Sequence, residues 1–230
     1  MSAAEPAAMV EPEVIRSRAA EIRERLRAAG DSGDQVALIA VTKGFAAPLI
    51  GRALAAGLVD LGENYAQELV AKAADAGSVG PGGERPRWHF IGGLQSNKVK
   101  LLAGVVHLWQ TVDRLALAEA IARRDPGARI LVQVNTTGEA QKSGCQPVDA
   151  PGLVGRAREL GLDVMGLMTI GPTDVGVDPR PGFARLRELG VACETRELSM
   201  GMSADYEAAV AEGSTMVRIG SALFGERPRA

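Results

Sequence analysis

Residues 36–43 read VALIAVTK, six apolar residues followed at once by a threonine and a lysine. A short run of this kind, rich in β-branched residues, is typical of a strand that is buried on both faces. Seven further strand-like runs follow along the chain. They lie at 59–62, 87–92, 105–111, 129–135, 163–170, 195–200 and 216–220. The sequence therefore predicts eight strands.

Helix-like segments separate these runs. A first amphipathic segment covers 13–29, with apolar residues at helical spacing and Gly30 as its stop. The others lie at 48–56, 65–76, 96–103, 113–123, 150–160, 180–189 and 204–212. Eight strand–helix units in 230 residues favour a closed barrel over an open sheet. We predict an α/β fold, a single TIM-type (β/α)8 barrel with an extra N-terminal helix.

Composition and charge narrow the class of protein. The net charge is −2 and no block of like charge stands out, so neither nucleic acid nor membrane is expected as a partner. The N-terminus lacks the basic and apolar regions of a signal peptide, which favours the cytoplasm. Cys145 and Cys193 lie far apart and are expected to be reduced thiols. Residues 1–12 are expected to form a flexible tail, and residues 13–230 one domain.

Polar residues gather where the predicted strands end. In a β/α barrel, chemistry concentrates at the carboxyl ends of the strands. The strand ends here carry Thr42, Lys43, Glu63, Asn64, His89, Gln110, Thr111, Asn135, Thr169, Ser199, Arg218 and Ser221. We expect most of them to face one common mouth.

Lys43 is the first candidate for chemistry at this mouth. Burial of an ammonium group without a partner is costly, and burial lowers the pKa of a lysine, which makes it a nucleophile and a former of Schiff bases. The alternative is a lysine that extends into the loop or pairs with Glu63.

The C-terminal segment 198–225 is the second candidate. Gly220 allows close backbone approach after the last strand, and Ser221 opens a short helix. Phosphate sites in barrels often form at this position. Ser203 is predicted as the N-cap of the preceding helix, with Asp205 and Glu207 in its first turn. The alternative is two ordinary capped helices without a ligand.

Arg218 and the two histidines complete the set of candidates. Arg218 either forms an ion pair with Glu63 or faces a ring nitrogen or carboxylate of a ligand. His89 and His107 have no neighbouring cysteine or second histidine in the pattern of a metal site. We therefore interpret both as hydrogen-bonded structural residues and predict no metal.

Seven segments together resemble a known family. They are AVTK (40–43), GENYAQE (62–68), WHFIGGLQSNK (88–98), QVN (133–135), GLMTI (166–170), LSMGMSADYEAAV (198–210) and GSTMVRIGSALFG (213–225). In this order and spacing the sequence resembles the YggS/PROSC family of pyridoxal 5′-phosphate (PLP) homeostasis proteins. The fold of that family is similar to the N-terminal barrel domain of alanine racemase.

The resemblance implies a role for each candidate. Lys43 would hold PLP as an internal imine, Arg218 would face the pyridine nitrogen and Asn64 would lie near the ring. The phosphate would be held by Ser203, Gly220 and Ser221. The sequence departs from the family at Thr42, where serine is usual, and at Gly44, where threonine is frequent.

The expected function is that of a PLP carrier or buffer that serves vitamin B6 and amino-acid balance. An arginine at the ring nitrogen makes the cofactor a weaker electron sink. Racemization also needs a second acid–base group, which alanine racemase takes from a β-rich domain, and we expect no such domain in this protein. We therefore expect a monomer without robust turnover that exchanges PLP with acceptor amines, including apo-enzymes. A weak amino-acid racemase and a Schiff-base aldolase are the alternatives.

Overall fold

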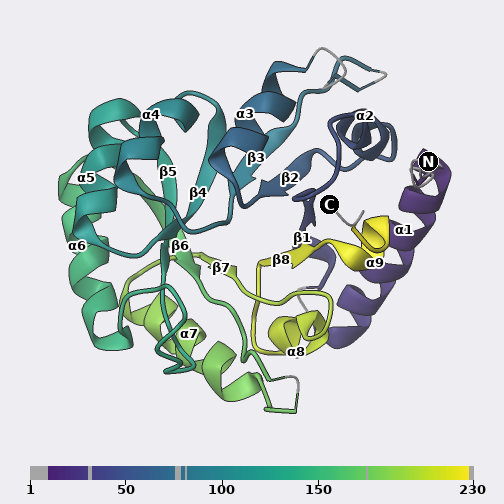
Figure 1. The fold of residues 1–230 in the computed structure, drawn as a ribbon. Coiled ribbons are helices and arrows are strands. Elements are labelled where there is room, and N and C mark those ends of the chain that lie inside the picture. Colours follow the sequence, from purple (N-terminus) through teal and green to yellow (C-terminus); the bar gives the residue numbers. More distant parts are fainter. Residues whose placement is uncertain (1–9, 31–32, 76–78, 81, 175, 228–230) are drawn as a thin grey trace, which may run out of the picture.

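Eight parallel strands form a closed barrel with helices on its outside (Figure 1). The computed structural model describes residues 10–30, 33–75, 79–80, 82–174 and 176–227. The strands pair in chain order, and the last pairs with the first. They are β1 (Ala37–Val41), β2 (Asp60–Glu63), β3 (Arg87–Phe90), β4 (Val106–Val112), β5 (Arg129–Gln133), β6 (Asp163–Met168), β7 (Glu197–Ser199) and β8 (Met216–Ile219).

The helices alternate with these strands, as predicted. They are α1 (Pro12–Ala29), α2 (Pro48–Ala55), α3 (Ala66–Ala74), α4 (Val99–Leu102), α5 (Leu115–Arg124), α6 (Ala150–Glu159), α7 (Arg180–Ala192), α8 (Tyr206–Ala211) and α9 (Ser221–Phe224). Short 3-10 turns lie at Gly33–Gln35, Ser96–Lys98 and Pro147–Asp149. The fold prediction is confirmed. Residues 1–9 of the predicted tail lie outside the described residues.

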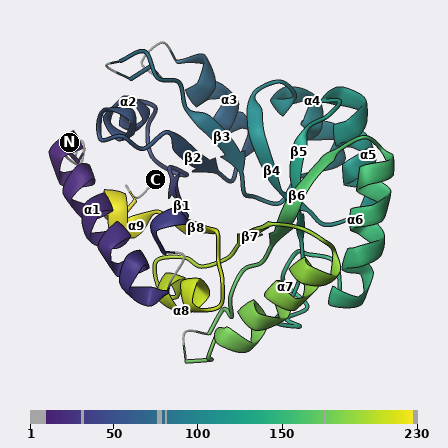
Figure 2. The same ribbon diagram turned by 180° about the vertical axis from the view of Figure 1, so that it is seen from behind.

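The extra helix α1 closes the ring of helices beside α8 and α9 (Figures 1 and 2). Pro12 occupies its first turn, where a missing N–H costs nothing. Ile15, Ala19, Ile22 and Leu26 are its buried residues, at the spacing of one helical face. Burial of this face fixes α1 against the barrel.

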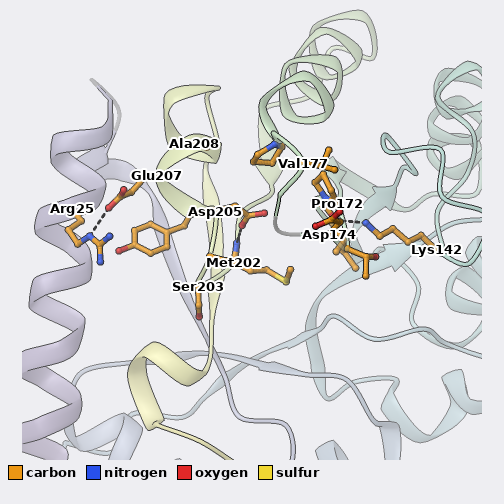
Figure 3. Close-up of a pocket in the computed structure, with 16 residues that line it drawn as sticks. Arg25, Lys142, Pro172, Asp174, Val177, Met202, Ser203, Asp205, Glu207 and Ala208 are labelled. Atoms are coloured by element: carbon orange, nitrogen blue, oxygen red, sulfur yellow. Dashed lines mark hydrogen bonds and ion pairs between the residues drawn. The ribbon is translucent and has the colours of Figure 1, made fainter.

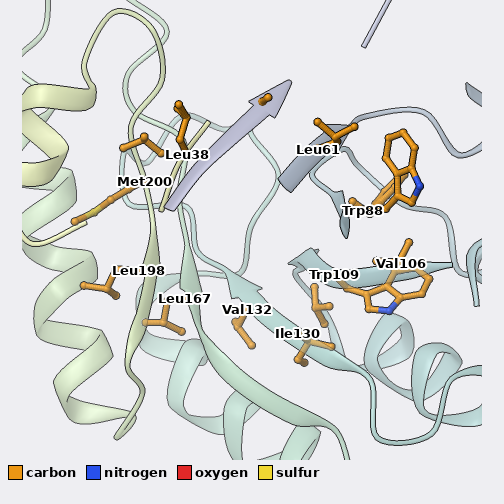
Figure 4. Packing of buried hydrophobic residues seen from close by; sticks show 14 of the residues in the cluster. Leu38, Leu61, Trp88, Val106, Trp109, Ile130, Val132, Leu167, Leu198 and Met200 are labelled. Atoms are coloured by element: carbon orange, nitrogen blue, oxygen red, sulfur yellow. The ribbon is translucent and has the colours of Figure 1, made fainter. Parts of the chain in front are cut away.

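Two apolar layers fill the molecule. Strand residues such as Leu38, Trp109 and Ile130 belong to the large cluster between strands and helices (Figure 4). A separate small cluster of Leu108, Leu131 and Met168 lies inside the barrel. Because side chains alternate along a strand, the polar residues two positions from this inner cluster also point inward. The barrel interior is therefore partly polar toward its mouth.

The prediction for α8 is wrong at its start. The helix begins at Tyr206 and its N-cap is Asp205, whereas Ser203 lies in the preceding turn. The Asp205 carboxylate accepts a hydrogen bond from the Met202 N–H at 2.6 Å, and the Met202 carbonyl accepts from the Asp205 N–H at 3.0 Å. Met202 and Asp205 thus close a turn immediately before the helix.

Within the described residues no helix is long and apolar enough to cross a membrane. The same residues contain no cluster of His, Cys, Asp and Glu that would hold a metal ion. Cys145 and Cys193 are both free thiols, as expected from their separation in the sequence.

Candidate functional site at the barrel mouth

Lys43 lies just past the end of β1 and is half-buried. Burial lowers its pKa, and the nearby guanidinium groups of Arg227 and Arg218 lower it further, against the opposing carboxylates of Glu63 and Glu68. No described side chain forms a hydrogen bond or ion pair with its ammonium group. The alternative pairing of Lys43 with Glu63 is therefore not found, and the amine is available to a ligand.

A buried ion cluster holds the backbone on both sides of Lys43. The Lys72 ammonium contacts Glu63 Oε1 at 2.5 Å and Glu68 Oε1 at 2.7 Å, and donates to the Thr42 carbonyl at 2.7 Å. Glu68 Oε1 also accepts from the Gly44 N–H at 2.6 Å. The peptide groups that flank Lys43 are thus tied to α3, which fixes where the lysine starts.

The two departures from the family pattern fit this cluster. The Thr42 hydroxyl donates to Glu63 Oε1 at 2.6 Å, a bond for which any hydroxyl at this position is suited. Gly44 has a φ of 75°, in the left-handed region that favours glycine. A Cβ at this position would also lie 3.2 Å from Arg227 Cδ.

Arg218 reaches the mouth from inside the barrel. Its guanidinium donates to Ser199 Oγ at 2.5 Å and to the Thr169 carbonyl at 2.7 Å, and contacts no carboxylate among the described residues. The predicted alternative, an ion pair with Glu63, is therefore wrong, because Glu63 pairs with Lys72. Burial lowers the pKa of Arg218 to about 10, so it stays protonated at neutral pH.

The expected phosphate residues lie after two adjacent strands. Gly220 follows β8 and is the N-cap of α9, and Ser221 is the exposed first residue of that helix. A Cβ on Gly220 would lie 3.3 Å from the Val41 carbonyl oxygen, so glycine permits the close passage beside β1. Ser203 is half-buried in the turn after β7. The first N–H groups of α9 have no partner within the helix and suit an anion.

Asn64 follows β2 directly and is half-buried. Its Oδ1 is buried and has no hydrogen-bond partner within the described part of the chain. Its carbonyl oxygen lies so close to Gly92 that a Cβ there would be 2.0 Å away. An unsatisfied buried oxygen is costly, so this position at the mouth is suited to a ligand that carries a donor.

A cavity of about 570 Å³ opens beside the mouth (Figure 3). It lies between residues 170–179 and 202–208, with Arg25 and Lys142 at its sides. Lys142 is paired with Glu139 and also donates to the Gly171 carbonyl. Ser203 is the one predicted site residue in the lining, so the cavity adjoins the predicted site and is not the same space.

Comparisons with known proteins agree on the family. The model of the alanine racemase N-terminal domain matches residues 15–228. The chain is 44% identical over 225 residues to the pyridoxal phosphate homeostasis protein of Pseudomonas aeruginosa, covering 94% of this chain and 95% of the relative. The human protein of the same name is 39% identical over 213 residues, covering 84% of this chain and 77% of the relative. The chain belongs to the YggS/PROSC family of pyridoxal phosphate homeostasis proteins.

Solved structures support the same family membership. PipY of Synechococcus elongatus with PLP bound is 32% identical, with a TM-score of 0.78, covering 92% of this chain and 100% of that chain. D-threo-3-hydroxyaspartate dehydratase from Delftia is 18% identical, with a TM-score of 0.66, covering 96% of this chain and 62% of that chain. The second comparison concerns the fold alone.

The residues at the mouth fit the parts of a PLP molecule. Lys43 provides a free amine of lowered pKa for the aldehyde, and Arg218 retains unused N–H donors for the ring nitrogen. The unsatisfied Asn64 Oδ1 provides an acceptor near them. The hydroxyls of Ser203 and Ser221 and the first N–H groups of α9 suit a phosphate. Among the described residues, none of these groups takes part in a competing ion pair.

Sequence reasoning missed the residues that support this site. Lys72 and Glu68 stand four apart on α3, a spacing at which helical side chains meet, but nothing in the sequence indicated burial of the pair. Arg227 was missed because it lies beyond the last recognisable motif. His89 was correctly predicted to be a hydrogen-bonded residue.

Proposed function

We propose that the protein binds PLP covalently through Lys43 and acts as a cytoplasmic carrier or buffer of this cofactor. The observation that carries the proposal is the unpaired, half-buried Lys43 ammonium, whose pKa is lowered by burial and by two guanidinium groups. The names of the relatives and the PLP-bound PipY structure support it.

Lys43 performs the chemical step. Its free amine would attack the aldehyde carbon of the cofactor, and loss of a water molecule would leave a C=N bond to the side chain. An incoming amine would then form the C=N bond in place of Lys43, and its two N–H hydrogens would pass to the Lys43 nitrogen, which is released as a free amine. The lowered pKa of Lys43 raises the fraction of free amine at neutral pH.

The remaining residues bind and orient. Ser203, Gly220 and Ser221 hold the phosphate, and Asn64 lies near the ring. Arg218 donates to the ring nitrogen, and since this arginine keeps its proton at neutral pH, the bound cofactor is a weak electron sink. Storage and transfer of PLP by a monomer, with apo-enzymes among the acceptors, fit such a site better than rapid turnover of amino acids.

An absorbance spectrum with added PLP tests the covalent bond. The wild-type protein is expected to give a visible band that borohydride abolishes, with the adduct on the Lys43 peptide by mass spectrometry. Lys43→Ala should give neither. Lys100→Ala, which removes an exposed lysine of α4, is the matched control and should behave as wild type. A trapped adduct at another lysine would overturn the assignment.

Turnover distinguishes the carrier from a weak racemase. With PLP bound, the carrier should release the cofactor to amino acids and to an apo-enzyme, but should not exchange the α-hydrogen of alanine for deuterium in D₂O. Exchange that requires both PLP and Lys43 would favour the racemase instead.

A further inference from the structure

A chain of hydrogen bonds crosses the inside of the barrel from Arg218 to its opposite end. Arg218 donates to Ser199 Oγ at 2.5 Å, and Ser199 donates to Gln110 Oε1 at 2.7 Å. Gln110 Nε2 lies 2.9 Å from His89 Nδ1, and His89 Nε2 lies 3.1 Å from Asp60 Oδ1. Asp60 is the first residue of β2, at the amino-terminal face. Apart from Asp60, all these residues are buried.

The proton positions in this chain follow from its two ends. Desolvation opposes ionisation of Asp60, but its bonds to His89 and Arg87 lower its pKa to about 2, so the carboxylate only accepts. His89 Nε2 must then carry the hydrogen, which leaves Nδ1 as the acceptor for the Gln110 amide. Ser199 donates to the amide oxygen and accepts from Arg218. Every donor therefore points from Arg218 toward Asp60.

This common direction makes the chain cooperative. Hydrogen bonds that share a direction polarise one another, especially in a buried environment. Arg218 contacts no carboxylate among the described residues, and the Asp60 carboxylate at the far end is the anion to which its charge is connected. Protonation of His89 Nδ1 would place two donors face to face and force the Gln110 amide to turn. Ser199 would then lose its acceptor.

We propose that His89, Gln110 and Ser199 are positioning residues that hold Arg218 in one orientation for the ring nitrogen of the cofactor. The inference rests on the proposed function for the identity of that cofactor. The hydrogen-bond chain itself is a property of the protein alone. Its consequence is that a change near Asp60 alters the electronic environment of a ligand at the opposite end of the barrel.

Several charged groups lie around His89 and would affect any measurement of it that varies the pH. Asp60 comes from β2 and is also bonded by Arg87 of β3. The His107 ring of β4 lies 5.8 Å from the His89 ring, and Arg129 of β5 approaches His107 at 3.5 Å. The hydrogen position on His89 is therefore measured directly.

The first experiment uses the protein without cofactor. In ¹⁵N-histidine NMR at pH 7, His89 should carry its hydrogen on Nε2, with Nδ1 unprotonated. The protein sequence contains two histidines, so the spectrum of His107→Gln assigns the signals of each. Gln110→Glu replaces the amide donor by an acceptor of the same shape, so His89 should become protonated on both nitrogens. A Nδ1–H tautomer in the wild type would overturn the proposal, whatever the protein binds.

The second experiment uses the PLP-loaded protein. Ser199→Ala removes the hydroxyl that links Arg218 to Gln110, and Ser199→Thr retains it. Ser199→Ala should shift the absorbance maximum of bound PLP and weaken PLP binding about tenfold, and Ser199→Thr should restore both. The borohydride adduct on Lys43 should form in both variants, which separates this proposal from the proposed function. A change in melting temperature alone, with spectrum and affinity unchanged, would reduce the chain to a structural role.

Discussion

Two buried cations support the mouth of this barrel in opposite ways. Lys72 is 2% exposed and contacts two carboxylates and a carbonyl oxygen, so each of its three donors has an acceptor. Arg218 is 4% exposed and bonds only a hydroxyl and a carbonyl. A guanidinium has five N–H donors, which leaves several unused. The two cations are buried alike and differ in how many of their N–H donors are bonded.

The difference teaches which cation supports the site and which contributes to binding. Lys72 neutralises Glu63 and Glu68 and anchors the backbone beside Lys43. Arg218 carries a charge whose nearest bonded partners are neutral. A buried cation whose donors are all bonded is expected to serve stability, and a buried cation with unused donors is expected to bind a ligand.

The largest effect is expected from Lys72→Met. The change leaves the Glu63 carboxylate, which is 0% exposed, without its cation. Loss of one partner of a buried ion pair costs about 3–5 kcal/mol, so the free energy of unfolding in urea at pH 7 should fall by that amount. Lys100→Met, on the exposed face of α4, should change it by less than about 0.5 kcal/mol. If the free energy of unfolding of Lys72→Met fell by less than about 1 kcal/mol, Lys72 would not be the stabilising cation that distinguishes it from Arg218.

Arg218→Met should weaken PLP binding more than it lowers stability. The substitution removes a buried charge that no carboxylate among the described residues contacts and leaves the Thr169 carbonyl without this donor. The free energy of unfolding should therefore fall by only about 1–2 kcal/mol, whereas PLP affinity should fall at least about tenfold. Urea unfolding and a PLP titration on the same preparations measure both. Equal stability losses in the two variants would show that both cations serve the fold.

The sequence was sufficient for the fold because the fold depends on local patterns. The run 36–41 predicts β1, and the helical spacing of Ile15 and Leu26 predicts α1, since each pattern reflects what that element buries. The start of α8 was missed because the sequence does not indicate the turn that Met202 and Asp205 close before the helix.

The sequence was less informative about the partners of the candidate residues. It suggested Glu63 as a partner for either Lys43 or Arg218, and the partner is Lys72. That pairing depends on how α3 packs against β2, which no local pattern contains. The roles of Lys43, Asn64, Ser203, Gly220 and Ser221 in holding PLP stay predictions.

Asp60→Asn tests the far end of the hydrogen-bond chain through acid stability. The pKa of Asp60 in the folded protein, about 2, lies below its ordinary value of 3.8, so the carboxylate stabilises the fold above about pH 4. This contribution is lost as the pH falls through 2. Because solvent screens the exposed partner Arg87, we expect about 1–2 kcal/mol. The difference in unfolding free energy between wild type and Asp60→Asn should narrow from pH 5 to pH 2. A constant difference would contradict the depressed pKa.

The smallest effect is expected from Arg227→Gln. Arg227 is exposed, and after burial its charge is the next contribution that lowers the pKa of Lys43. Without the Arg227 charge the pKa of Lys43 should rise, so that a smaller fraction of Lys43 is free amine at neutral pH. Because solvent screens an exposed charge, the rate of PLP capture at pH 7 should fall only about two- to threefold and recover at higher pH. Arg185→Gln, an exposed arginine of α7, should leave the rate unchanged. A rate equally low at every pH would indicate that Arg227 contacts the cofactor instead. Arg227 would then be a ligand-binding cation, as Arg218 is expected to be.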